Sequence, residues 1–410
     1  MKNKVLHNII RFVALIICSH YSFSQNSMTT NDFKDHTTYF SLSKDHQFQG
    51  NKMYKKLKQI TKNAQFIGIA EVHQSEQLSY FTSSFLELLS EQCFNNFALE
   101  LGPYSAKILA EISVNPEDTR LNINKLNRLY GKKEFPKIPL IFVDKVEDVK
   151  FINTASSLGY NFWGLDQEYL FSYEMHLDRL YEHYNNKTPE FIQLYNASKV
   201  VLENAIFKNK LPKGETSNCW LKDNETLNAF FSKFDSNDSA IKYINALKTS
   251  MGIYCKQETA SGGNQERADY MKSNFMIKYN QLLKKEAKPK VVLKLGSVHL
   301  THSTSQLGVN DIGKFLSEKA KANNTEFLSF FYLPRYKNGE DLINNDQFKS
   351  LSIVLSLGKK NKWTLIDLRP IRKMMLEGQL NTKNEIVAFG LISYDFVLIP
   401  PDDKNGTLNY

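Results

Sequence analysis

The chain has 410 residues, of which 42% are hydrophobic, 12% aromatic and 23% charged. This composition excludes a disordered, collagen-like or coiled-coil chain, and the length allows one large core with insertions. The formal net charge is +9, from 52 basic and 43 acidic residues. Because the basic residues are interleaved with acids and form no basic face with aromatic residues, we predict no nucleic-acid partner.

Residues 1–24 are predicted to be a signal peptide. Three basic residues precede a short apolar run over residues 12–18, and the small residues Ser22 and Ser24 favour cleavage before Gln25. The apolar run is too short to span a bilayer, and no later segment is long or apolar enough. We therefore expect an exported protein, periplasmic or secreted, with no transmembrane span.

The four cysteines have no metal-finger spacing. Cys18 raises the alternative of a lipid anchor, although the preceding Ile17 is larger than the residue that a lipoprotein signal requires. In the oxidising compartment that export implies, Cys219 and Cys255 lie in one helical region and could pair. Cys93 lies at the end of an apolar helix, so we expect a buried thiol there.

After a polar N-terminal lead-in over residues 25–52, short apolar strands alternate with amphipathic helices. The predicted elements are a strand over 66–70, a helix over 75–92, a strand over 97–99, a helix beginning at Pro103, a helix over 144–158 and a strand over 162–165. Strand, helix and strand at this spacing are typical of right-handed crossovers in a largely parallel sheet.

From residue 169 to residue 287 the pattern is almost wholly helical, which predicts an inserted helical cap. The sheet then resumes, with strands expected over 291–295, 327–333, 363–366 and 396–399. We therefore predict an α/β fold with a mostly parallel central sheet flanked by helices. Its catalytic domain comprises residues 53–168 and 288–410, on either side of the helical cap.

Four of the predicted strands finish on residue types that carry out chemistry. They supply Glu71 and His73 after the first strand, Glu100 after the second, Asp166 and Glu168 after the third, and His299 and His302 after the resumed strand. Substrate sites form at the carboxyl ends of parallel strands. The sequence therefore predicts a pocket of carboxylates and imidazoles, suited to general acid–base catalysis or to a divalent metal.

Most of these residues also have a structural interpretation. Glu100, Asp166 and Glu168 each stand where an acid commonly caps the next helix. His299 has the alternative of a buried histidine with satisfied hydrogen bonds, and His302 is open to either interpretation. Their shared position at strand ends favours a functional site more than any one of them does.

Four stretches of the sequence resemble one known family. They are residues 68–73 (GIAEVH), 97–100 (FALE), 164–168 (GLDQE) and 294–299 (KLGSVH). In this order they are similar to the erythromycin esterase-like group, whose wider superfamily includes haem-uptake ChaN-like proteins and the Tiki and TraB-type metalloproteases. Arg267, Met271 and Asn274 resemble the Arg-x-x-x-Met-x-x-Asn helix of the esterase-like group. The resemblance extends over residues 67–400.

The sequence departs from the esterase-like pattern at the first motif. Ala70 stands where the group usually has glycine before the glutamate, and only Val72 separates Glu71 from His73. Esterases of the group commonly have two residues there, whereas the ChaN-like and Tiki-like relatives have one. The resemblance therefore does not extend to a macrolide as the substrate.

The resemblance implies a catalytic scheme. His73 would be the general base that deprotonates a water attacking a carbonyl, and Glu71 or Glu100 would orient its imidazole. His299 would bind the substrate or the developing oxyanion, or act as a second base. Arg267 would stabilise negative charge, with a surface arginine as the alternative. No Gly-x-Ser-x-Gly motif occurs, which argues against a serine esterase.

By the same resemblance Asp166 completes the catalytic set, and Glu168 and His302 join Arg267 as residues expected to contact a small-molecule substrate. The favoured interpretation is a hydrolase of an ester or amide that needs no cofactor. Two alternatives stay open. In one, His73, His299, Glu71 and Glu100 bind a divalent metal that activates water. In the other, the protein carries haem on an axial histidine or tyrosine.

Overall fold

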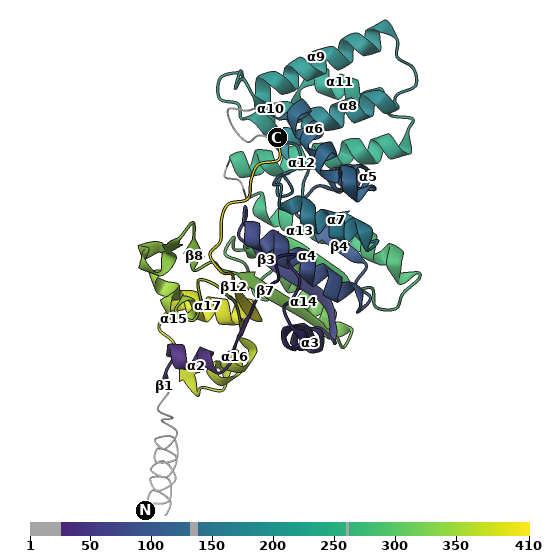
Figure 1. Ribbon diagram of the computed structural model, residues 1–410. Helices are drawn as coiled ribbons and strands as arrows, with labels where there is room; N and C mark the ends of the chain where they lie inside the picture. Colours follow the sequence, from purple (N-terminus) through teal and green to yellow (C-terminus); the bar gives the residue numbers. More distant parts are fainter. Residues whose placement is uncertain (1–25, 132–137, 260–261) are drawn as a thin grey trace, which may run out of the picture.

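The computed structural model describes residues 26–131, 138–259 and 262–410, and its centre is an eight-stranded sheet (Figure 1). In spatial order the strands are β2 (Thr37–Phe40), β10 (Trp363–Asp367), β12 (Phe396–Ile399), β7 (Glu326–Tyr332), β3 (Ala64–Glu71), β6 (Val291–Gly296), β4 (Asn96–Leu99) and β5 (Asn161–Gly164). Strand β10 is antiparallel to both of its neighbours, and all other neighbouring pairs are parallel. The predicted α/β class with a mostly parallel sheet is therefore confirmed.

Helices cover both faces of the sheet, so its central strands are buried on both sides. On β3, Ile67 and Ile69 face one apolar cluster while Phe66 and Ala70 face the other, as alternation along a strand requires. Helices α4 (Glu76–Ser90) and α7 (Asp148–Ser157) cover the first face, and α13 (Asn264–Leu283) and α14 (Ile312–Ala322) cover the second. This two-sided burial explains why the strands read as continuous apolar runs.

The described elements between β5 and β6 are all helical. They are η1 (Leu170–Ser172), α8 (Tyr173–His183), α9 (Pro189–Ile206), α10 (Ser217–Asp223), α11 (Glu225–Ser232), α12 (Asp238–Glu258) and α13. Helices α8 to α12 pack around their own apolar cluster, which includes Phe191, Phe230 and Leu247, whereas α13 packs on the sheet. A disulfide between Cys219 and Cys255 joins α10 to α12.

The N-terminal lead-in contains more structure than its polar sequence indicates. It forms β1 (Asn26–Ser27), α2 (Thr30–Lys34) and β2, the strand that pairs with β10 at the edge of the sheet. The side chains of Phe33 and Phe40 are 0% and 6% exposed. Isolated apolar residues of this kind do not make a periodic pattern, so the strand and the helix were missed from the sequence.

The remaining elements fill the periphery of the sheet. They are α3 (Asn51–Ile60), α5 (Pro103–Ile112), α6 (Pro116–Tyr130), η2 (Ser297–His299), β8 (Tyr336–Lys337), β9 (Glu340–Asp341), η3 (Leu342–Asn344), η4 (Asp346–Leu351), α15 (Ser352–Leu355), α16 (Arg369–Leu376), β11 (Leu380–Asn381) and α17 (Glu385–Ser393). No helix in the described part of the chain combines the length and apolarity needed to cross a membrane. The predicted signal peptide and Cys18 lie outside the described residues.

The prediction of a buried thiol at Cys93 is wrong. Helix α4 ends at Ser90, and Cys93 takes a positive φ of 63° in the turn that follows. This turn directs Phe94 into the core and leaves Cys93 exposed.

The C-terminal residues 403–409 form a strap that holds two loops together. Ser75 donates its hydroxyl to Asp403 at 2.9 Å, and the Gly406 N–H donates to the carbonyl of the neighbouring Gln74 at 2.9 Å. Farther along, the Asn409 N–H donates to the Asp144 carbonyl at 2.9 Å. The strap thereby joins the loop after β3 to the loop before α7, and Figure 1 shows it as the yellow trace that rises from the sheet.

Candidate active site

Four strand ends meet at one edge of the sheet and place charged side chains together. Glu71 is the last residue of β3, Glu100 follows β4, and Asp166 stands two residues after β5. Strand β6 lies between β3 and β4 and continues into the turn η2 that ends at His299. The crossovers thus bring these four predicted residues to one edge, and each is at least nine-tenths buried.

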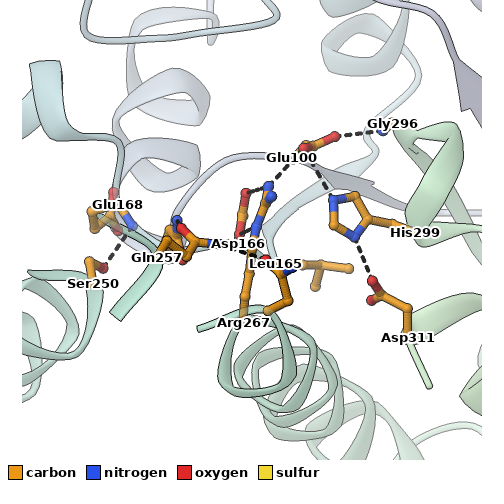
Figure 2. Close-up of polar contacts among 12 residues, drawn as sticks. Glu100, Leu165, Asp166, Glu168, Ser250, Gln257, Arg267, Gly296, His299 and Asp311 are labelled. Atoms are coloured by element: carbon orange, nitrogen blue, oxygen red, sulfur yellow. Dashed lines mark hydrogen bonds and ion pairs between the residues drawn. The ribbon is translucent and has the colours of Figure 1, made fainter. Parts of the chain in front are cut away.

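Arg267 connects two of these strand ends from helix α13 (Figure 2). Its Nε donates to one oxygen of Asp166 at 2.9 Å and its Nη2 to the other at 2.5 Å, while Nη2 also donates to Glu100 at 2.9 Å. Two turns farther along α13, the Asn274 amide donates to the Leu165 carbonyl at 2.9 Å. Arg267 is therefore part of the cluster rather than a surface residue.

Glu100 is the centre of one half of the site. It accepts the Gly296 N–H at 2.5 Å, and its other oxygen faces Nε2 of His299 at 3.5 Å. Nδ1 of His299 contacts Asp311 at 2.7 Å (Figure 2). Burial lowers the pKa of His299, but Glu100 and Asp311 outweigh burial and raise this pKa to about 10.

The contact with His299 that raises the pKa of the imidazole also lowers the pKa of Glu100. Burial raises the pKa of Glu100, but His299, Arg267 and His73 outweigh it and hold this pKa well below its usual value. At neutral pH the buried group is therefore a carboxylate held between an imidazolium and a guanidinium.

The other half of the site is built on Glu71. Its Oε1 lies 3.3 Å from Nδ1 of His73, and both atoms are buried without an aligned hydrogen bond to any other described residue. Its Oε2 accepts from Lys294, whose side chain is 4% exposed. Burial lowers the pKa of His73, but Glu71 and Glu100 outweigh it and leave this pKa above its usual value. The His73 side chain is 36% exposed, so water can reach its imidazole.

Phe142 holds the imidazole of His73 from one side. The two rings stack with centroids 3.9 Å apart and planes 13° apart. Phe142 has a positive φ of 67°, which is costly for a bulky side chain. Its ring also lines two cavities of about 100 Å³ each, one beside Asp166 and Arg267 and the other beside Glu71 and Lys294.

Gly296 keeps the space between the two halves open. A Cβ at this position would lie 3.1 Å from Oε2 of Glu100 and 3.3 Å from Nε2 of His73. The second nitrogen of His73 therefore faces a space that any larger residue would occupy.

Glu71, His73 and Glu100 are also the described residues that come nearest to a metal site. One ligand atom from each lies within 4.8 Å of the others. Both carboxylates already have cationic partners, since Lys294 binds Glu71 and Arg267 binds Glu100. His299, the fourth predicted ligand, has both ring nitrogens facing carboxylates.

Glu168 lies away from this cluster, at the opposite end of Figure 2 from His299. It is fully buried and accepts the N–H groups of Tyr104 and Ser105, at 2.7 and 3.2 Å, in the first turn of α5. Its other partner is Nε2 of His176, at 2.9 Å. Glu168 therefore caps α5, a helix that precedes its own strand, whereas the structural alternative from the sequence was a cap on the following helix, and it lines neither of the two small cavities.

His302 is not brought to the cavities either. Its Nε2 contacts Asp395 at 2.6 Å and its Nδ1 contacts Ser317 on α14 at 2.6 Å. Asp395 also accepts from Arg372 at 2.7 Å and from the Ser329 N–H at 3.0 Å. Burial raises the pKa of Asp395, but His302 and Arg372 outweigh it and lower this pKa to about 2. This cluster ties α14 and α16 to the sheet.

Three residues of the site were not singled out from the sequence. Lys294 carried a signal, because it is the one charged residue in the buried strand VVLKLG. Nothing in the sequence indicated Asp311 or Phe142, because their positions depend on loops whose path the sequence pattern does not define.

Comparisons with solved structures identify the fold. A histidine-to-asparagine variant of the erythromycin esterase EreC, in its open conformation, matches with a TM-score of 0.52 and 14% identity over 91% of this chain and 100% of that chain. A succinoglycan biosynthesis protein matches with a TM-score of 0.56 and 14% identity over 92% of this chain and 97% of that chain. A protein from Bacillus cereus matches with a TM-score of 0.56 and 12% identity over 93% of this chain and 99% of that chain.

A scan against protein-family models and a search of curated proteins found no match. The structural matches nevertheless extend over nearly the whole of each chain, including the helical segment. The resemblance seen in the sequence is therefore confirmed at the level of the fold: this chain has the erythromycin esterase-like fold.

Proposed function

We propose that this protein is a hydrolase that adds water to an ester or amide carbonyl, with His73 as the general base. The observation that supports this proposal is the pair formed by Glu71 and His73. The buried carboxylate faces Nδ1 of the imidazole, and Nε2 faces the space in front of Gly296. A proton held on Nδ1 leaves the lone pair of Nε2 free to accept a proton from water.

In this scheme the oxygen of a water molecule bonds to the carbonyl carbon while its proton passes to Nε2 of His73. The carbonyl oxygen becomes an oxyanion, and the guanidinium of Arg267, which lines the cavity beside Phe142, supplies positive charge to it. When the intermediate collapses, the bond to the leaving alcohol or amine breaks. The leaving group takes the proton from His73, and the acid product is released.

His299 takes a different role from the one expected of a second base. With a pKa of about 10 it holds a proton on both nitrogens at neutral pH, and its side chain is 2% exposed. We assign it as a positioning residue that fixes Glu100, which in turn orients Arg267.

The residues present fit a resident divalent metal poorly, so no step is assigned to one. Lys294 binds one oxygen of Glu71, and Arg267 and the Gly296 N–H bind the two oxygens of Glu100, so Oε1 of Glu71 is the one oxygen of these two carboxylates without an aligned donor among the described residues. Two fixed cations already balance these carboxylates, and a divalent ion would add uncompensated positive charge in a buried site.

The test is an ester screen with purified residues 25–410, including erythromycin and short-chain nitrophenyl esters. His73→Ala should lower kcat/KM about 10²–10⁴-fold. The matched control His36→Ala, which changes a histidine before β2, should leave kcat/KM unchanged. Equal activity in His73→Ala would exclude this residue as the base.

Metal analysis and absorbance spectra of the same samples separate the alternatives. The proposal expects a colourless protein that chelators do not inactivate. About one equivalent of a metal that is lost in His73→Ala would indicate a metallohydrolase instead. A Soret band would indicate a haem carrier.

We also propose that the protein is exported to the periplasm or secreted. The sequence of residues 1–24 supports this, as does the disulfide between Cys219 and Cys255, a bond typical of oxidising compartments. Cell fractionation should recover the protein outside the cytoplasm, beginning at Gln25. Recovery of uncleaved protein in the cytoplasm would contradict this proposal.

A further inference from the structure

A groove of about 890 Å³ lies beside the edge strand β5, between helices α5, α12 and α13. Its lining contains four lysines and neither aspartate nor glutamate. They are Lys107, Lys242, Lys278 and Lys285, all exposed, and none forms an ion pair within the described part of the chain. A concave surface with charge of one sign concentrates ligands of the opposite sign.

The neutral side chains of the groove indicate what else the ligand carries. Asn245, Thr249 and Gln281 are exposed and provide both donors and acceptors, which match hydroxyl groups. Phe162 is half-buried and Ile277 is 54% exposed, so the groove also presents apolar surface. A ligand with hydroxyl groups, apolar ring faces and negative charge would satisfy all three kinds of contact.

The groove adjoins a second cavity. Tyr104 and Lys107 line this cavity of about 280 Å³ as well as the groove, and it also contains His183 and Arg179, which pairs with Glu111 at 3.3 Å. The two adjoining cavities together suit an extended chain.

We infer that this groove binds an anionic polysaccharide, a chain of sugars that carry carboxylates. Nucleic acid is less suited, because its bases stack on exposed aromatic faces. Here Trp163 and Tyr160 are 3% and 5% exposed, and Tyr243 covers one face of the Tyr104 ring at 3.9 Å, so Phe162 and Tyr270, both half-buried, are the other aromatic residues of the groove. The lysines are point charges, whereas arginine is the usual partner of phosphate and base edges.

The groove approaches the candidate active site along β5. Gly164 lines the groove, and Asn274, which also lines it, donates to the Leu165 carbonyl next to Asp166. The inference nevertheless goes beyond the proposed hydrolysis, because binding alone tests it.

The experiment measures binding of a short polygalacturonate to residues 25–410 by calorimetry, in about 50 mM and 200 mM salt. The double charge reversal Lys242→Glu, Lys278→Glu should weaken binding at least about tenfold, since each change replaces an attraction by a repulsion. The control Lys321→Glu, Lys349→Glu alters the net charge equally at two exposed lysines outside the groove and should change binding less than about twofold. Equal melting temperatures of the three proteins would show that the fold is kept.

Each other outcome overturns the inference. No binding by the unaltered chain, or equal loss in both double variants, would mean that the groove has no specific role. Binding of dextran as tight as that of polygalacturonate would exclude recognition of charge. Tighter binding of single-stranded oligothymidine would assign the groove to nucleic acid.

Discussion

Two glutamate–histidine pairs near the same edge of the sheet have different surroundings. Glu71 and His73 are 3.3 Å apart, and the His73 side chain is 36% exposed and stacks on Phe142, which lines two cavities. Glu168 and His176 are 2.9 Å apart, and both side chains are 0% exposed. The carboxylate of Glu168 is bound to the first turn of α5, whereas that of Glu71 faces an imidazole that water can reach. Access to the second nitrogen therefore distinguishes the pair that we propose to be catalytic from the buried pair.

In the proposed mechanism, Arg267, which lines the cavity beside Asp166, should show the largest effect of substitution after His73. Arg267→Lys replaces a planar fork with one ammonium, which cannot bind Asp166 through two atoms and Glu100 at the same time. We expect kcat to fall about 10²–10³-fold in the ester assay. Arg369→Lys, which alters an arginine paired with Asp367 on β10, serves as the control. Activity near that of the control would remove Arg267 from the mechanism.

The buried pair should govern stability instead. Glu168→Gln removes a buried carboxylate that accepts from Tyr104 and Ser105 and contacts His176, and it should lower the free energy of unfolding by about 3 kcal/mol. Activity per folded molecule should stay unchanged at temperatures below the transition. Loss of activity without loss of stability would reverse the assignment of the two pairs.

The pH dependence of that effect has a defined sign. Burial raises the pKa of Glu168, but His176 and Ser105 outweigh it and lower this pKa below its usual value. Its stabilising effect is therefore present above the pKa of the unfolded chain and is lost as the pH falls through the folded pKa. Urea denaturation should show a smaller difference between Glu168→Gln and the unaltered protein at acid pH than at pH 7.

The smallest effect is expected at Glu71, where the conservative change alters the base without removing it. Glu71→Gln takes away a charge that stabilises the imidazolium of His73, so the pKa of His73 should fall. The rise of kcat/KM with pH should move to lower pH, and its plateau should decrease about tenfold. A profile that keeps its midpoint would show that the two residues are not coupled.

Much of this site could be predicted because parallel strands end at a common edge. Apolar runs located β3, β4, β5 and β6, and the topology then brought Glu71, Glu100, Asp166 and His299 together. The sequence did not distinguish Glu168, because its role depends on the approach of the first turn of α5 to a loop after a different strand. Phe142 could not be predicted either, because its position depends on an irregular loop rather than on a periodic element.

The strap formed by residues 403–409 has a consequence for how the chain folds during translation. It fixes the loop beside His73 and the loop that leads from Phe142 into α7, yet more than three hundred residues separate Ser75 from Asp403. At about 5–20 residues per second, translation of that interval takes on the order of half a minute. Strands β3, β4, β5, β6 and β7 are all synthesised before Asp403, so they can pair before the strap fastens the loops around the imidazole.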